Sequence, residues 1–200
     1  MANSKNRLLL ASIALLYSCL QTRTAWSETA KKDIIGFLTT DPRLKKAKQW
    51  AEDSGILQEI DFSMYGGKIT LVLPSNNAFE EFERDHPTWK AKLVSDSSDI
   101  ETLLLFASTD HRISVADVKK GVYEEPESII SILSEYSSIS KEGKLCVAGH
   151  TRAVPCNHPE RLPCCAHIDL DQPIVTTSGN IYLVDKVLLP QDLIDKLQEE

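Results

Sequence analysis

The order of the expected elements constrains the fold of this chain most strongly, because helices come first and strands follow. Apolar residues recur at helical spacing after Asp41-Pro42, after Ser75 and over 98–106. From about residue 128, short β-branched segments separated by turn residues replace this pattern; they are SIISIL, KLCVA, PIVTT and IYLV. Helices and strands that are segregated along the chain predict an α+β fold.

Short-range signals predict where several elements begin and end. Asp41 and Ser75 are expected N-caps, and Ser98–Glu101 is typical of a capping box. The segment ITLVL at 69–73 predicts a buried strand among the helices. Ser178-Gly179 predicts a hairpin turn between the last two strands.

The first 27 residues have the pattern of a secretory signal peptide. Lys5 and Arg7 precede an apolar run at 8–20, and small residues follow, so cleavage is expected after Ser27. The run is shorter than the roughly 20 residues that span a bilayer. We therefore expect a secreted, extracellular protein; an uncleaved signal anchor is the alternative.

The charge of the chain argues against polyanionic partners. The chain has 22 basic and 29 acidic residues, and the first 27 residues hold three of the basic and none of the acidic ones, which leaves a net charge of −10. An acidic surface repels phosphate backbones, so nucleic acid is not an expected partner. The polar C-terminal tail, 193–200, lacks the apolar segment of a lipid anchor, so no stable membrane anchor is expected.

Cysteines are confined to two places in the chain. Cys19 lies in the predicted signal peptide, and the other four lie within 20 residues of one another: Cys146, Cys156, Cys164 and Cys165. An even number in a secreted chain predicts two disulfides. Cys164 and Cys165 are adjacent and are not expected to pair with each other. Each therefore pairs with Cys146 or Cys156, and both arrangements remain open.

A zinc site is the alternative use of these cysteines. The ligand types are present in Cys146, Cys156, Cys164, His150, His158 and His167. The spacing lacks the short Cys-x-x-Cys element of common zinc sites, so disulfides are favoured. A Cys165–His167 nucleophilic pair is a third reading, but closeness in sequence does not establish such a pair.

Three segments resemble the fasciclin-like domain family. They are DIIGFLTTDPRLKKAKQWAEDSGILQEI (33–60), TLVLPSNNAFEEF (70–82) and GNIYLVDKVLLP (179–190). The second is similar to the family's first signature box, in which a strand runs through proline into a capped helix, and the third is similar to the closing box. The matching residues are Pro74, Ser75, Ala78, Phe79, Ile181, Val184, Asp185, Val187, Leu188 and Pro190.

The resemblance implies one domain over 28–192, followed by the tail 193–200. Residues 149–167 look like a cysteine-containing insertion between strands. The family fold that the resemblance implies is a compact β-wedge of two sheets with helices packed on one side. This agrees with the helix-then-strand pattern.

The chain departs from the family at two histidines. The family usually has a Tyr/Phe-His pair where this chain has Phe106-Ala107, and usually has a histidine where this chain has Tyr182. Residues around the first motif contribute to integrin-linked adhesion in some members. No Arg-Gly-Asp tripeptide is present. The resemblance therefore leaves integrin-type adhesion open for this chain.

Most signature residues are expected to support the fold. Asn76 at a helix start is typical of a cap, and Asp185 at a strand end is expected to accept hydrogen bonds from backbone N–H groups. Phe79, Phe82 and Phe106 are expected in the core.

The resemblance and the predicted secretion together imply extracellular adhesion or protein–protein interaction. The expected partner is an extracellular protein, a matrix component or a second copy of the chain. The insertion is the expected contact surface, because disulfides would rigidify it and lower the entropy cost of binding. The alternative is that the insertion only stabilises the domain.

Two other functional classes are weighed against adhesion. A secreted module for small ligands or lipids would hold its ligand in an apolar pocket between the sheets. For an enzyme, the sequence has no Gly-x-Ser-x-Gly elbow, no phosphate-binding glycine loop and no His-Glu-x-x-His helix. No catalytic residue and no cofactor are therefore expected.

Overall fold

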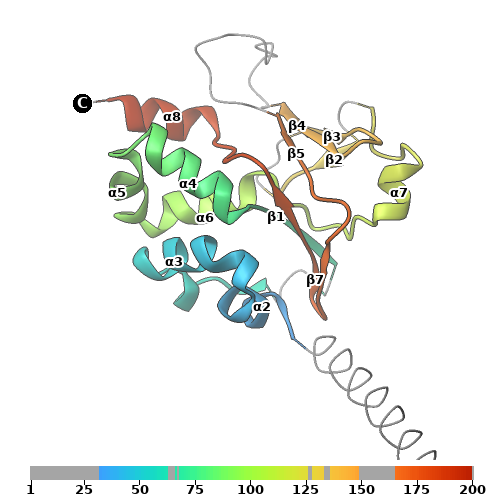
Figure 1. Cartoon of the computed structure of the whole chain (residues 1–200), viewed down its shortest axis with the longest axis horizontal. Helices are drawn as coiled ribbons and strands as arrows, with labels where there is room; N and C mark the ends of the chain where they lie inside the picture. The colour runs from blue at the N-terminus through green and yellow to red at the C-terminus, as the bar shows by residue number, and fades with distance from the viewer. Residues whose placement is uncertain are drawn as a thin grey trace, which may run out of the picture.

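The computed structural model describes residues 32–199 except 63–65, 67, 126–127, 133–135 and 149–164. The predicted signal peptide and most of the predicted insertion lie outside these residues. Helices α2 to α6 and α8 lie on one side of a central sheet, and a second sheet and α7 lie on the other side (Figure 1). The predicted α+β wedge of two sheets is confirmed, with α7 apart from the main helical layer.

Polar caps begin several of the helices. The helices are α2 (Ile34–Thr40), α3 (Lys45–Asp53), α4 (Asn76–Asp85), α5 (Trp89–Val94), α6 (Ser97–Phe106), α7 (Val115–Lys119) and α8 (Gln191–Gln198). Asp33 accepts a hydrogen bond from Gly36 N at 2.7 Å and caps α2, which helical periodicity alone does not predict. Asp41 caps a 3₁₀ turn, Pro42–Leu44, that leads directly into α3. The predicted helix after Asp41 therefore starts as a tighter turn.

The predicted capping box at Ser98 is wrong. The N-cap of α6 is Asp96, whose Oδ1 accepts hydrogen bonds from Ser98 N at 3.0 Å and from Ser98 Oγ at 2.7 Å. A carboxylate is a stronger acceptor than a hydroxyl, so the earlier residue begins the helix. Ser98 lies inside the first turn.

The central sheet, sheet A, joins the two ends of the domain. Its order is β1 (Ile69–Pro74), β7 (Gly179–Val184) and β6 (Ile174–Val175), with β1 parallel to β7 and β6 antiparallel to β7. Gly179 begins β7 opposite Ile69, and a Cβ at Gly179 would overlap the carbonyl oxygen of Ile69. The predicted hairpin between the last two strands is present, but Gly179 belongs to the strand and not to the turn.

The second sheet, sheet B, is antiparallel throughout. Its order is β2 (Ile129–Ile130), β3 (Tyr136–Ile139), β4 (Lys144–Ala148) and β5 (Cys165–His167). Among the described residues of the strand expected over 128–133, Ile129–Ile130 form β2. Strand β3 is not predicted by its Tyr-Ser-Ser-Ile sequence. β5 falls within the predicted insertion, so the last three residues of that segment belong to the sheet.

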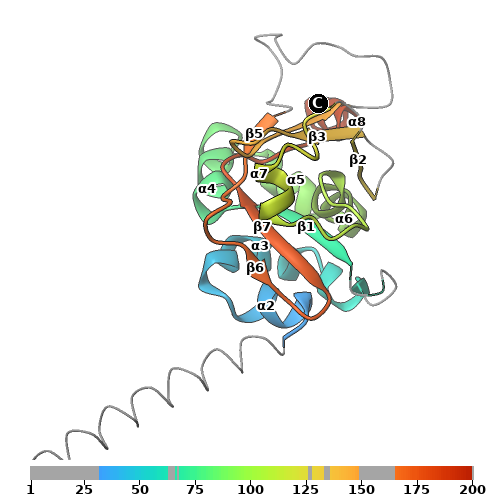
Figure 2. The ribbon, with the colours of Figure 1, turned by 90° about the vertical axis from the view of Figure 1, so that its right-hand side faces the viewer.

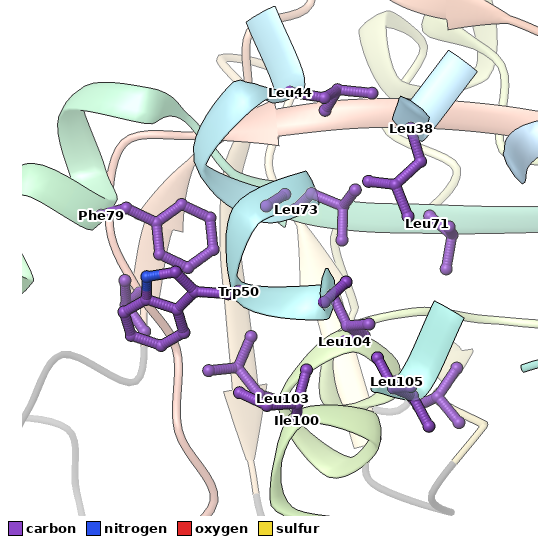
Figure 3. Packing of buried hydrophobic residues seen from close by; sticks show 14 of the residues in the cluster. Leu38, Leu44, Trp50, Leu71, Leu73, Phe79, Ile100, Leu103, Leu104 and Leu105 are labelled. Atoms are coloured by element: carbon purple, nitrogen blue, oxygen red, sulfur yellow. The ribbon is translucent and has the colours of Figure 1, made fainter. Parts of the chain in front are cut away.

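Alternating side chains in β1 and β7 divide the core into two parts. Figure 2 shows the domain from the side of sheet B and α7. Leu71 and Leu73 point toward the helices and pack in one cluster with Trp50 (Figure 3). Val72 and Tyr182 point the other way and pack with the apolar face of sheet B. Both strands are therefore buried on both faces, as their apolar sequences require. The three predicted core aromatics are buried: Phe79, Phe82 and Phe106.

Candidate interaction surface

Sheet B carries a disulfide on its outer face. Cys146 of β4 lies opposite Cys165 of β5 in the antiparallel register, and the two form a disulfide with Cα atoms 4.1 Å apart. The neighbouring pair, Leu145 and Ala166, is buried. Because side chains alternate along a strand, both cysteines point to the opposite face. The disulfide therefore ties together the two strands that the insertion connects.

A hollow of about 320 Å³, open to solvent, lies where β5 meets the ends of β1 and β7. Its lining residues are Ser75, His167, Ile168, Asp169, Leu183, Val184 and Asp185. The three aliphatic residues are buried, whereas His167 and Asp185 are exposed. The hollow thus has an apolar floor and a polar rim, and it adjoins the strand by which the insertion returns to the sheet.

Hydrogen bonds between β5 and the end of β7 shape this hollow. Asp185 Oδ1 accepts from His167 N at 2.7 Å, and Asp185 N donates to His167 O at 3.1 Å. Asp169 N donates to Leu183 O at 2.8 Å. Asp185 therefore links the end of β7 in sheet A to the backbone of β5 in sheet B. These hydrogen bonds hold His167 and Asp185 together at the rim of the hollow.

A second polar arrangement holds the loop between α6 and α7. Thr70 Oγ1 donates to His111 O at 2.7 Å and accepts from Ile113 N at 2.9 Å. Asn180 Nδ2 at 2.8 Å and Tyr182 Oη at 3.0 Å both donate to Ile113 O. All three side chains are buried, and burial raises the pKa of the Tyr182 phenol, which keeps it a donor. Sequence reasoning missed this network; its one signal is polar Thr70 and Asn180 within apolar strands.

The family model of the fasciclin domain matches residues 42–190. The chain belongs to the fasciclin domain family. A solved FAS1 domain pair from the insect cell adhesion molecule fasciclin I matches with a TM-score of 0.56 at 14% identity, covering 82% of this chain and 53% of that chain. At this identity the match shows the fold alone, and the chain spans about half of that structure. No curated protein matches the chain.

Fasciclin domains occur in cell adhesion proteins and are adhesion-type modules. Within the part of the chain that the structure describes, no helix is both long and apolar enough to cross a membrane.

The signature residues of this fasciclin domain occupy structural positions. Ser75 Oγ accepts from Ala78 N at 3.2 Å and caps α4, directly after Pro74 ends β1. Asn76 does not cap its own helix: its Oδ1 accepts from Lys46 N at 2.9 Å and so connects α4 to α3. The remaining signature positions are core or boundary positions: Ala78 and Phe79 are buried, and Pro190 precedes α8.

The two positions where the family usually has histidine are buried here. Ala107 and Tyr182 both belong to the cluster between the sheets. The Tyr182 hydroxyl is used internally, on Ile113 O. Neither residue is therefore available on the surface of this fasciclin domain for contact with a partner.

The cysteine pairing is settled for one bond only. Of the two partners that the sequence leaves open for Cys146, the structure has Cys165. Cys156 and Cys164 lie outside the described residues, and a bond between them stays a prediction.

The disulfide removes Cys146 from the candidate ligands of the alternative zinc site. Zinc binds the thiolate of cysteine, and Cys146 is bonded to another sulfur. His167 is exposed on β5, and the described residues contain no group of three or more His, Cys, Asp or Glu placed to hold a metal ion. The other candidate ligands lie outside the described residues: His150, Cys156, His158 and Cys164.

The hollow contains the residue types of a hydrolytic triad without its contacts. Ser75, His167 and Asp185 line it together. Among the described residues, the one histidine–carboxylate contact within 4.0 Å is between His111 and Asp110, on the exposed loop. The Ser75 hydroxyl is used as a helix cap. These three residues therefore form no proton relay.

The space between the sheets is occupied by side chains. Tyr182, 2% exposed, is the largest of the fully buried residues in that cluster. The hollow lies instead at the ends of the strands and faces solvent. Its position suits contact with another macromolecule better than enclosure of a small ligand.

Proposed function

We propose that this chain is a secreted fasciclin domain protein that mediates extracellular adhesion or protein–protein interaction. Membership of a family known in cell adhesion supports adhesion, and a disulfide supports an oxidising compartment outside the cytosol. The proposal includes cleavage of the signal peptide after Ser27. The partner is an extracellular or matrix protein, because the acidic chain disfavours nucleic acid.

We further propose that the insertion and the hollow beside it form the contact surface. The observation that carries this proposal is the disulfide between Cys146 and Cys165, which joins directly paired residues of the two strands that lead into the insertion. A loop whose ends are held loses less conformational entropy on binding than a free loop. The apolar floor of the hollow, with exposed His167 and Asp185 at its rim, supplies a mixed contact of the kind found at protein interfaces.

A loop replacement tests this proposal. Residues 149–164 are replaced by Asn-Gly, which leaves Val147, Ala148 and the two new residues between the paired Cys146 and Cys165. A four-residue hairpin connection of this kind is common in antiparallel sheets, so β4, β5 and the disulfide should be retained. Adherent cells are then allowed to attach to surfaces coated with residues 28–200 or with the replacement protein.

We expect attachment to the wild-type protein and its loss in the replacement protein at unchanged thermal stability of the domain. The matched control is Glu80→Gln/Glu81→Gln, which alters two exposed residues of α4 and should attach cells normally. Equal attachment to wild-type and replacement proteins would remove the insertion as the contact surface. No attachment to the folded wild-type protein would contradict the adhesive function.

A further inference from the structure

A second exposed surface lies at the other end of β7 from the hollow. Asp185 follows β7 beside the hollow, whereas Asn180, near the start of β7, pairs with Val175 of β6. Val175 is 59% exposed, and β6 is the edge strand of sheet A in the described residues. Directly opposed residues of antiparallel strands share one face, so Val175 lies beside Asn180. The amide of Asn180 in turn holds Ile113 O.

The loop between α6 and α7 brings both signs of charge next to this valine. Asp110 and Arg112 are exposed. The Arg112 guanidinium donates to the carbonyl oxygen of Thr176, the residue after Val175, at 3.1 Å. Within the described residues Arg112 has no carboxylate partner. Asp110 contacts the imidazole of His111 at 2.5 Å and is still 61% exposed. We call Asp110, Arg112 and Val175 the β6 patch.

Buried side chains hold the backbone of the loop that carries Asp110 and Arg112. Three buried side chains, Thr70, Asn180 and Tyr182, make four hydrogen bonds with the backbones of His111 and Ile113, on either side of Arg112. A charged loop that is already ordered loses little entropy when a partner binds. The patch therefore presents an apolar residue with one cation and one anion in a fixed relation.

We propose that two copies of this chain associate through the β6 patch about a two-fold axis. A two-fold contact joins the same patch on both copies, so each charge must find its opposite within that patch. Arg112 of each copy pairs with Asp110 of the other, and the two Val175 side chains meet between these pairs. Two chains of net charge −10 repel each other, and Arg112, which has no carboxylate partner among the described residues, brings a cation to the contact from each copy.

Sedimentation equilibrium of residues 28–200 tests the association. We expect a weak dimer, with a dissociation constant of about 0.1–1 mM, because the patch is small and exposed ion pairs contribute little. Arg112→Glu and Asp110→Arg each place like charges opposite one another and should weaken the dimer at least about tenfold. The combined D110R/R112E variant exchanges the two charges and should restore wild-type association.

Matched controls separate the patch from general surface effects. Val175→Thr should weaken the dimer, whereas Val122→Thr, at a 54% exposed valine elsewhere, should not. Arg84→Glu, at an exposed arginine of α4, should also leave the dimer unchanged. Thermal unfolding of each variant confirms that it is folded.

Three outcomes would overturn the proposal. They are a monomer at every concentration, a dimer that neither R112E nor D110R weakens, and a folded D110R/R112E variant that does not recover association. Failure of the dimer proposal would not count against the adhesive function, because the loop replacement tests a different surface, the insertion.

Discussion

Individual buried polar residues decide how this domain positions its loops. Thr70 satisfies two backbone groups of the loop between α6 and α7, whereas the buried hydroxyl of Ser137 in β3 has no hydrogen-bond partner among the residues that the structure describes. A buried hydroxyl stabilises a fold only when it is paired, since it loses its hydrogen bonds to water. These two residues therefore offer a direct comparison between a paired and an unpaired group.

Removing the two hydroxyls should have opposite consequences. Thr70→Val leaves His111 O and Ile113 N without their partner, and we expect a loss of about 2 kcal/mol in the free energy of unfolding. Ser137→Ala removes an unpaired group and should be neutral or stabilising by up to about 1 kcal/mol. Urea denaturation of both variants measures the difference. Equal destabilisation by the two substitutions would contradict the role given to the loop network.

At the scale of elements, contacts between helices and between strands differ from the pattern in the sequence. Glu80, Glu81 and Asp85 of α4 are exposed, whereas Glu83 is half-buried. Its carboxylate accepts from Lys46 Nζ at 2.7 Å and from Trp50 Nε1 at 2.9 Å, both in α3. Burial raises the pKa of Glu83, but the hydrogen bonds from Lys46 and Trp50 and the charges of Lys46 and Lys90 outweigh it, and the pKa is lowered. Glu83 therefore joins α4 to α3 in its charged form.

The stabilisation from Glu83 should depend on pH. Because its pKa is lower in the folded than in the unfolded chain, the stabilisation is present above the ordinary value of 4.5 and is lost as pH falls through the lowered pKa. Glu83→Gln should cost about 1 kcal/mol at neutral pH, and this cost should shrink at about pH 3. Urea denaturation at both pH values checks this, with exposed Glu80→Gln as the control. A pH-independent cost would show that the charge of Glu83 is not involved.

The disulfide between β4 and β5 should stabilise the domain through loop closure. Its cysteines are separated by 19 positions, and closing a loop of this length is worth about 3 kcal/mol. Cys146→Ser/Cys165→Ser should lower the free energy of unfolding by that order while the far-ultraviolet circular dichroism stays native, because the strands also pair through their backbones. Unchanged stability would mean that the bond does not constrain the unfolded chain.

The parallel pairing of β1 with β7 depends on a close approach at its first position. Gly179→Ala would push a methyl group against the carbonyl oxygen of Ile69, so the strands must shift apart. We expect a loss of about 3 kcal/mol, measured by urea denaturation. Gly55→Ala serves as the comparison, because its φ of +80° is strained for alanine while no atom lies in the way. A smaller loss at Gly179 than at Gly55 would contradict the close approach.

At the scale of the whole molecule, the sequence predicts elements better than their partners. Strand β1 and the caps at Asp41 and Ser75 follow from local pattern, and the α+β class follows from the order of elements. Strand β3 is missed because two serines interrupt its apolar pattern. The register of β4 against β5, which selects Cys165 as the partner of Cys146, is set by packing of the two sheets. No local signal carries such information.

Tertiary contacts also explain what sequence reasoning did not find in the candidate surface. The hollow joins residues from three distant segments of the chain, and the β6 patch joins the loop after α6 to a strand near the C-terminus. The resemblance to the family located β1 and β7, whose two signature boxes pair in the central sheet. Residues such as Arg112 and Val175 lie outside those boxes, so only the fold brings them together.

The central claim is that this chain is a secreted fasciclin domain whose insertion is held by disulfides. The intact mass of the protein released by expressing eukaryotic cells tests it most directly, measured without reductant after alkylation of free thiols and accompanied by a zinc assay. We predict residues 28–200, lighter by the hydrogens of two disulfides, without alkylation and without zinc, and peptide mapping that pairs Cys146 with Cys165 and Cys156 with Cys164. A retained signal peptide, alkylated cysteines or stoichiometric zinc would contradict this claim.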